Sequence, residues 1–197
     1  AGVRARASVR FGSRVETGEV QFRDDGISGI PVLQQSSEVI EEILKKKSAD
    51  LFLDLLPDYP EKTLKELLDR NRKETSVEVF LRGWLNRKLI LPVLKKARIY
   101  GNTEVNALSG EERERLVRTV KAYPYTVTGF GDFEASQVTG GGVPLSEISD
   151  DFESRIVPGL YITGELLDVD GKCGGYNLHF AFGSGRLSAD AIVKGLA

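Results

Sequence analysis

Residues 159–185 read GLYITGELLDVDGKCGGYNLHFAFGSG, and the expected architecture follows from this stretch. Its apolar run at 160–162 stops at Thr163-Gly164-Glu165, which predicts a buried strand with a carboxylate at its carboxyl end. A second glycine cluster, 171–175, then precedes apolar residues spaced three and four apart, which predicts a helix with one apolar face: Leu178, Ala181, Phe182, Gly185, Ala189, Ile192, Val193 and Leu196. A glycine turn that directs a helix N-terminus at a ligand suits an electron-rich group, because free amides and the positive helix end attract it.

Chemistry alone leaves two interpretations of these glycines, a cradle for a ligand or a tight strand-to-helix turn. The string GLYITGELLDVDGKCGGYNL resembles the C-terminal FAD-binding signature of a bacterial family of NAD(P)/FAD-dependent oxidoreductases that includes 3-dehydro-bile-acid reductases. The resemblance implies that Thr163, Gly164 and Glu165 belong to the FAD site and that Glu165 bonds the ribityl hydroxyls. It also implies that a set of backbone amides faces the pyrimidine edge of the flavin: those of Gly174, Gly175, Tyr176, Asn177 and Leu178. Reduced flavin carries negative charge at that edge, so a helix N-terminus suits it.

A second glycine-rich segment, FEASQVTGGGV at residues 133–143, is on chemistry alone only a glycine-rich strand end. It is similar to an EAxVTxGGV segment at which the family's chain returns from an inserted domain to the flavin domain. The resemblance implies that Thr139, Gly140 and Gly141 lie near the flavin. It also implies two parts: residues 1–131 as an inserted domain that caps the flavin and shapes the substrate pocket, and residues 132–197 as the C-terminal strand-helix part of an FAD-binding α/β domain.

The first 131 residues alternate strand and helix patterns. Period-two alternation predicts a half-buried strand over 3–11, with Arg4, Arg6 and Arg10 either on a solvated face or gripping an anion. Further strands are expected at 15–22, 49–56 and 125–128. Helices are expected at 32–44, 61–72, 77–91 and 92–97, and a capping box of Ser109 and Glu112 starts another that runs to about residue 121. With the resemblance, the fold class is α+β: a barrel-like inserted domain of antiparallel strands plus helices, followed by the strand-helix part of a flavin domain.

Composition narrows the class of protein. The chain has 197 residues, 41% of them hydrophobic and 28% charged, with a net charge of −2, all ordinary for a globular protein. It has no apolar run long enough to span a membrane and a single cysteine, so a reducing, cytoplasmic location without membrane partners is expected. The absence of methionine and of a GxGxxG turn predicts a processed chain or a fragment without the N-terminal FAD-binding segment. Such a fragment is expected to bind FAD weakly or not at all and to be inactive alone.

The basic block at residues 69–98 is the only feature that favours nucleic acid. Its cations alternate with apolar residues at helical spacing, so we interpret them as the solvated faces of core helices, with nucleic acid not expected as a partner. One alternative is a stand-alone binding domain that presents this basic helical face to an anionic partner. Another is a regulatory remnant in which the flavin signature is structural only.

Few other residues suggest a catalytic or metal-binding role. The lone His179 cannot build a metal site, so no metal is expected, and packing or surface exposure is favoured over proton donation to a substrate. Cys173 has no second cysteine for redox pairing. The sequence therefore assigns no catalytic side chain, and the resemblance implies hydride transfer between NAD(P)H, FAD and a small organic substrate.

Overall fold

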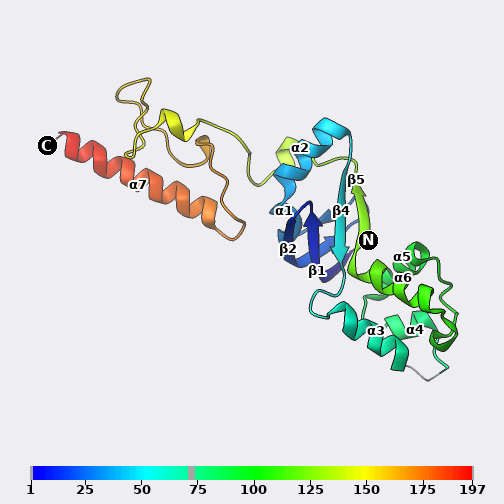
Figure 1. The fold of residues 1–197 in the computed structure, drawn as a ribbon. Helices are drawn as coiled ribbons and strands as arrows, with labels where there is room; N and C mark the ends of the chain where they lie inside the picture. Colours follow the sequence, from blue (N-terminus) through cyan, green and yellow to red (C-terminus); the bar gives the residue numbers. More distant parts are fainter. Residues whose placement is uncertain (1, 71–73, 197) are drawn as a thin grey trace. The chain divides into compact units, whose positions relative to one another are not determined.

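In the computed structural model of this chain, strands β1 (Val3–Phe11) and β2 (Arg14–Phe22) pair antiparallel over their full length around a turn at Gly12 (Figure 1). The structure describes residues 2–70 and 74–196. The chain divides into two units, Ala1–Phe130 and Gly131–Ala197.

The first unit contains a five-stranded antiparallel sheet. Its other strands are β3 (Ile27–Ser28), β4 (Ala49–Asp54) and β5 (Tyr123–Val127), and the order is β3-β2-β1-β4-β5. The alternation along β1 puts Val3, Ala7 and Val9 in the interior, whereas Arg4 and Arg10 point to solvent. The predicted α+β class, with antiparallel strands plus helices, is confirmed.

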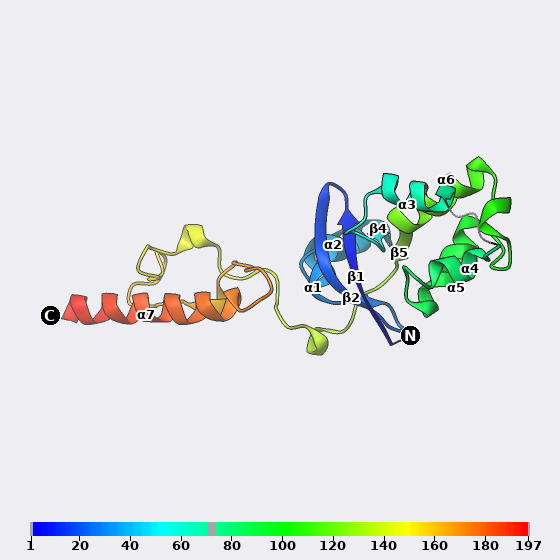
Figure 2. The same ribbon diagram turned by 90° about the horizontal axis from the view of Figure 1, so that it is seen from below.

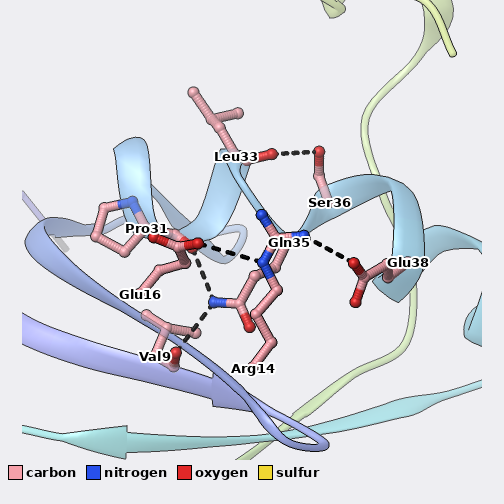
Figure 3. Close-up of polar contacts among 8 residues, drawn as sticks. All are labelled: Val9, Arg14, Glu16, Pro31, Leu33, Gln35, Ser36 and Glu38. Atoms are coloured by element: carbon pink, nitrogen blue, oxygen red, sulfur yellow. Dashed lines mark hydrogen bonds and ion pairs between the residues drawn. The ribbon is translucent and has the colours of Figure 1, made fainter. Parts of the chain in front are cut away.

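Two helices cover the sheet where one was expected at 32–44. Helices α1 (Ile30–Leu33) and α2 (Ser36–Lys46) are separated at Gln35, whose side chain is 1% exposed. Its Nε2 donates to the carbonyl oxygens of Val9 and Pro31, each at 3.0 Å (Figure 3). The helix breaks here because Gln35 leaves the helical conformation (φ −113°, ψ 0°) at the point where its amide enters the interior and ties both segments to β1.

Besides the Gln35 hydrogen bonds, the side chain of Arg14 links the β1–β2 hairpin to α2. Arg14 makes ion pairs with Glu16 at 3.2 Å and with Glu38 at 2.7 Å (Figure 3). The hydrogen bond to Glu38 is the main cause of a pKa of Arg14 raised above its ordinary value. The hairpin and α2 are thus linked both in the interior and at the surface.

The remaining helices of this unit lie together beside the end of β4 and the start of β5 (Figures 1 and 2). They are α3 (Glu61–Arg70), α4 (Val77–Leu81), α5 (Arg87–Ala97), the 3-10 turn η1 (Val105–Ala107) and α6 (Gly110–Lys121). The end of the helix expected at 61–72 lies outside the described residues. The capping box of Ser109 and Glu112 is confirmed.

The helix boundary expected at Pro92 is wrong. Helix α4 ends at Leu81, and α5 begins at Arg87 and continues through Pro92. The break falls earlier because Asn86 caps α5: its Oδ1 accepts the Lys88 N–H at 3.0 Å.

Strand boundaries also differ slightly from expectation. β4 ends at Asp54 rather than at Leu56, because the Asp54 carboxylate accepts the Leu56 N–H at 3.0 Å and pairs with Lys121 at 2.6 Å. The main hydrophobic core, which includes Val9, Leu51, Ile90 and Leu116, lies entirely in the first unit.

The second unit consists of turns and one long helix, α7 (Tyr176–Leu196). The turns are η2 (Phe133–Ala135), η3 (Leu145–Glu147) and η4 (Gly164–Leu166). The buried strand expected at 160–162 is wrong: Leu160 is 45% exposed, and Tyr161 forms only an isolated bridge with Glu153. Hydrogen bonds from the Ser154 N–H to the Leu160 oxygen and from the Ile162 N–H to the Phe152 oxygen fold this segment back on its own loop.

The apolar face expected on α7 is also not the buried face. Leu178, Phe182 and Val193 are 67%, 78% and 67% exposed, whereas Ser184 and Ser188 are 2% and 4% exposed. Small residues occupy the contact because η4 packs closely against the helix. The side chain of Leu196, also expected on that face, lies outside the described part.

Candidate functional site

The two glycine-rich segments of the second unit lie side by side. The Val143 N–H donates to the Leu166 oxygen at 2.8 Å, and the Asp168 N–H donates to the Val143 oxygen at 3.0 Å. These bonds form a parallel bridge between Val143 and Leu167, whose side chain is 1% exposed. The segments around Thr139–Gly141 and Thr163–Glu165 thus form one structural element, although Thr139 and Glu165 lie 26 positions apart in the sequence.

Glu165 joins these segments a second time. Its Oε1 accepts the Thr139 N–H at 2.9 Å, and the carboxylate stays exposed. A carboxylate has about four acceptor positions, so this bond leaves capacity on Oε2. The structure therefore gives Glu165 a tie to Thr139, a role that the sequence did not predict.

Gly142 makes the close approach of the segments possible. Its φ of +146° and its position leave no room for a side chain, since a Cβ would lie 2.6 Å from the Leu166 oxygen and 2.9 Å from the Leu167 carbonyl carbon. Sequence reasoning assigned Thr139, Gly140 and Gly141 to the site but missed Gly142. The GGG run was the signal that could have identified it.

The turn at Gly164 is seated on α7. The Gly164 N–H donates to Ser184 Oγ at 3.0 Å, and that hydroxyl donates to the Ala181 oxygen at 3.1 Å. A Cβ on Gly164 would touch Ala181 at 3.4 Å, and the glycine has a φ of +67°. Thr163 and Glu165, on either side of this glycine, are therefore held in place against the helix. Ser184 is a positioning residue that sequence reasoning missed, because a serine within an apolar pattern gave no signal.

The start of α7 is closed by Asn177. Its Oδ1 accepts the Gly171 N–H at 2.6 Å, and its Nδ2 donates to the Gly171 oxygen at 3.2 Å. The Asn177 side chain is thus occupied with the loop, and only its backbone N–H points along the helix axis toward the N-terminal end. Gly171 is confined by this contact, because a Cβ there would lie 2.7 Å from Asn177 Oδ1.

The glycines just before α7 are open. Gly174 and Gly175 have φ values of +117° and +94°, and a Cβ on either would meet no atom within 4 Å among the described residues. The first N–H groups of a helix have no intrahelical acceptor, and in α7 these belong to Tyr176, Asn177 and Leu178. The His179 N–H is already bonded to the Gly175 oxygen at 2.9 Å. An exposed, glycine-lined amide surface results, suited to an electron-rich edge.

Side chains with catalytic chemistry are few at this site. His179 is exposed on the first turn of α7, and Cys173 is half-buried. Among the described residues, no group of three or more histidine, cysteine, aspartate or glutamate side chains could hold a metal ion. Nor does that part of the chain contain a helix with the length and apolarity needed to cross a membrane.

Comparison with known proteins gives a family match and several relatives. The family described as HI0933-like protein barrel and H2TH domain matches residues 1–138. A 3-dehydro-bile acid delta(4,6)-reductase of Clostridium scindens is 36% identical over 98% of this chain and 50% of its own length. Ribosomal RNA dihydrouridine synthases of Escherichia coli and Haemophilus influenzae are each 28% identical, over 87% and 89% of this chain and 42% of their own lengths.

The chain therefore spans about half the length of the curated relatives it matches. The resemblance drawn from residues 159–178 is confirmed by the bile acid reductase, which matches almost the whole chain, and the relatives' names relate the chain to oxidoreductases. With most of the chain matched by the family, this protein belongs to the HI0933-like family.

Proposed function

We propose that this chain is part of an FAD-dependent oxidoreductase that transfers hydride between NAD(P)H, flavin and an organic substrate. The observation that carries the proposal is the junction in the second unit. There Thr139–Val143 and Gly164–Asp168 are joined by three hydrogen bonds and seated on α7, next to the open amides at its start.

The residues at this junction fit the isoalloxazine and ribityl parts of FAD. Gly174 and Gly175 leave the approach to the helix amides free of side chains, and the positive helix end favours the anionic edge of reduced flavin. Glu165 Oε2 has capacity for a ribityl hydroxyl while Oε1 holds Thr139. Asn177 contributes its backbone N–H rather than its amide side chain, which Gly171 occupies. When bound, FAD supplies the hydride acceptor and donor.

The relatives suggest the class of substrate. A delta(4,6)-reductase is named for the double bonds that it reduces, and a dihydrouridine synthase is named for a product with a reduced ring double bond. We extend that chemistry to this protein: a hydride adds to one carbon of the double bond and a proton to its neighbour, while NAD(P)H becomes NAD(P)⁺. The ring belongs either to a small organic molecule or to a base within RNA.

Each of the two units has its own role in this proposal. The first unit, as an inserted domain, would cap the flavin and shape the substrate pocket, and the second would supply the carboxyl-terminal part of the flavin domain. The exposed apolar side chains of α7, among them Leu178 and Phe182, support this arrangement. Such a surface suits a helix that packs against further parts of a longer protein.

Glu165 gives the direct test. In the protein that carries this chain, Glu165→Ala removes charge-assisted bonds worth about 1.5–3 kcal/mol, so FAD affinity is expected to fall by roughly tenfold to a hundredfold. Titration of the apoprotein, followed by quenching of flavin fluorescence, measures this change. Asp190→Ala, which removes an exposed carboxylate farther along α7, is the matched control and should leave FAD affinity unchanged. Equal FAD affinity in Glu165→Ala and wild type would contradict the assignment.

A further inference from the structure

The helices of the first unit carry a long segment without acidic residues. From residue 79 to residue 103 the sequence has no aspartate or glutamate, but it has six cations: Arg82, Arg87, Lys88, Lys95, Lys96 and Arg98. The segment includes all of α5 and the turn before it. Such a local excess of positive charge is unusual in a chain whose net charge is −2.

Arg82 lies before α5 and pairs with Glu78 at 2.7 Å, whereas the other five cations lie on the exposed side of α5 or at its end. The opposite side is buried in the core through Leu89, Ile90, Val93, Leu94 and Ala97. Arg87, Lys95, Lys96 and Arg98 are exposed, and none forms an ion pair with another described residue. On α2, by contrast, Lys45 and Lys46 are each paired one turn away, with Glu41 and Glu42. The charge of these four side chains is thus not neutralised by described residues, and an anionic partner complements it. We call this surface, from Arg87 to Arg98, the basic face.

A cavity lies at the amino-terminal end of the basic face. Its volume is about 180 Å³, and four side chains that are at most 8% exposed form its apolar lining: Leu55, Leu56, Leu85 and Leu89. A cavity of about 150 Å³ is large enough to hold a benzene ring. This cavity therefore has room for one ring.

Aromatic side chains form one wall of the cavity. The rings of Tyr59 and Trp84 meet edge to face, with centroids 5.1 Å apart and planes at 89°. Tyr59 is 41% exposed, and Trp84 is half-buried. Aromatic faces next to positive charge are the usual platform for an unpaired base, since every base has a face that can stack.

The rim of the cavity supplies hydrogen-bonding groups. Arg6 Nε donates to both oxygens of Asp58, at 3.1 and 2.9 Å, and its terminal guanidinium nitrogens keep further N–H donors. Asn86 uses Oδ1 to cap α5, so its amide Nδ2 remains a donor. Donors and a carboxylate acceptor around an apolar, ring-sized cavity match the polar edge of a heterocyclic base.

We propose that the basic face and this cavity form a binding site for single-stranded nucleic acid, with phosphates along α5 and one base in the cavity. The cations and the ring-sized aromatic cavity together match a strand in which every unit carries both a phosphate and a ring. An anionic membrane supplies no such ring, and an acidic protein supplies one only where an aromatic side chain lies beside its carboxylates. The site uses no residue of the flavin junction, so its failure in the tests below would leave the proposed flavin site untouched.

Trp84 is the only tryptophan in the chain, so its fluorescence reports on the cavity. Titration of the full chain with a 12-nucleotide oligouridylate should quench this fluorescence as the base stacks, and binding should weaken steeply with salt. A thymidylate DNA of the same length distinguishes RNA from DNA as the source of the strand. Inorganic polyphosphate should compete without quenching. Binding of the oligonucleotide that leaves Trp84 fluorescence unchanged would overturn the cavity assignment.

Charge reversal tests the basic face. Lys95→Glu with Lys96→Glu should lower oligonucleotide affinity by roughly tenfold or more at 0.1 M salt and reduce the salt slope by about 1.4, because two phosphate contacts are lost. Lys45→Glu with Lys46→Glu on α2 makes the same change in net charge and is expected to alter affinity less than twofold. Equal effects of the two double variants would show a nonspecific response to net charge and would overturn the proposal.

Asn86→Asp tests the rim with the fold retained, because aspartate caps a helix as well as asparagine. Its carboxylate replaces the Nδ2 donor and repels nearby phosphates, so affinity should fall while circular dichroism remains that of the wild type. Unchanged oligonucleotide affinity in this variant would exclude a base in the cavity.

Equal binding to phosphatidylserine vesicles and to oligouridylate would instead identify a general anion surface and overturn the proposal.

Discussion

At the scale of single residues, the second unit depends on a glycine with no room for a side chain. Gly142 allows Val143 to pair with Leu166 and Asp168 on the neighbouring segment. Gly140 lies in the same run but has ordinary space, since its nearest contact would be Asp170 Oδ2 at 3.6 Å. Alanine substitutions at the two glycines therefore distinguish a clash with the neighbouring segment, expected at Gly142, from the mere addition of a methyl group, expected at Gly140.

Gly142→Ala is expected to destabilise this junction by about 1–3 kcal/mol, because the new Cβ meets backbone atoms at a φ that other residues rarely adopt. Hydrogen exchange of the Val143 and Asp168 amides measures the loss directly, since both amides donate across the junction. Gly140→Ala should leave their protection near the wild-type level. Equal exchange in wild type and Gly142→Ala would show that the segments are held together by other contacts.

In the first unit, stability depends on one buried polar side chain, that of Gln35. Gln35→Ala leaves the carbonyl oxygens of Val9 and Pro31 without their buried donor, so the free energy of unfolding should fall by about 1–3 kcal/mol. Urea unfolding followed by circular dichroism measures it. Gln34→Ala, at the adjacent and less buried glutamine, is the control and should change stability little. Gln35→Glu should be worse than Gln35→Ala, because it places a carboxylate oxygen against those carbonyls.

At the scale of elements, α6 shows how a short motif fixes a helix end. The Ser109 N–H donates to Glu112 Oε2 at 2.9 Å, and the Glu112 N–H donates to Ser109 Oγ at 3.2 Å. The bond from the Ser109 backbone N–H is the main cause of a pKa of Glu112 below its ordinary value of 4.5, with the Ser109 side chain second. The ionised carboxylate therefore favours the folded helix.

The lowered pKa of Glu112 makes the stability of the fold depend on pH. A depressed pKa in the folded state contributes stability above the unfolded value, near 4.5, and this contribution is lost as pH falls through the folded pKa. The stability difference between wild type and Glu112→Gln should therefore shrink below about pH 4.5. Urea unfolding between pH 6 and pH 3 tests this expectation, with Glu111→Gln as the control outside the capping box. A difference that is constant with pH would contradict the expected role of the ionised carboxylate.

Sequence patterns located most elements of the first unit but not the burial in the second. The alternation over Val3–Phe11 and the Ser109–Glu112 spacing predicted their elements because neighbouring residues determine both. The spacing predicted the apolar residues along one side of α7 but not their exposure, because a close turn at Gly164 selects the small residues Ser184 and Ser188 for the contact. The Glu165–Thr139 bond was also not predicted, since it joins backbone and side chain across a sequence separation that no local pattern encodes.

At the scale of the whole molecule, the hydrophobic core belongs to the first unit. A chain ending at Phe130 should therefore unfold cooperatively, with a melting temperature within a few degrees of that of residues 1–197. Differential scanning calorimetry of both chains tests this expectation. Residues 1–122 are the informative control: they lack β5, which pairs with β4 from Ala49 to Leu53, and should not give a cooperative transition. A fragment 1–130 without a transition would show that its core needs the second unit.

The adjacent strands β4 and β5 carry a further consequence for how such proteins diverge. They pair directly, yet α3 to α6 lie between them in the sequence, so the whole helical segment is an insertion between two paired strands. Insertions of this kind can change in length, charge or loop structure while the strand register that anchors them stays the same. Evolution can therefore remodel α5 and the helices around it without rebuilding the sheet, and a single scaffold can be adapted to new ligands one helix at a time.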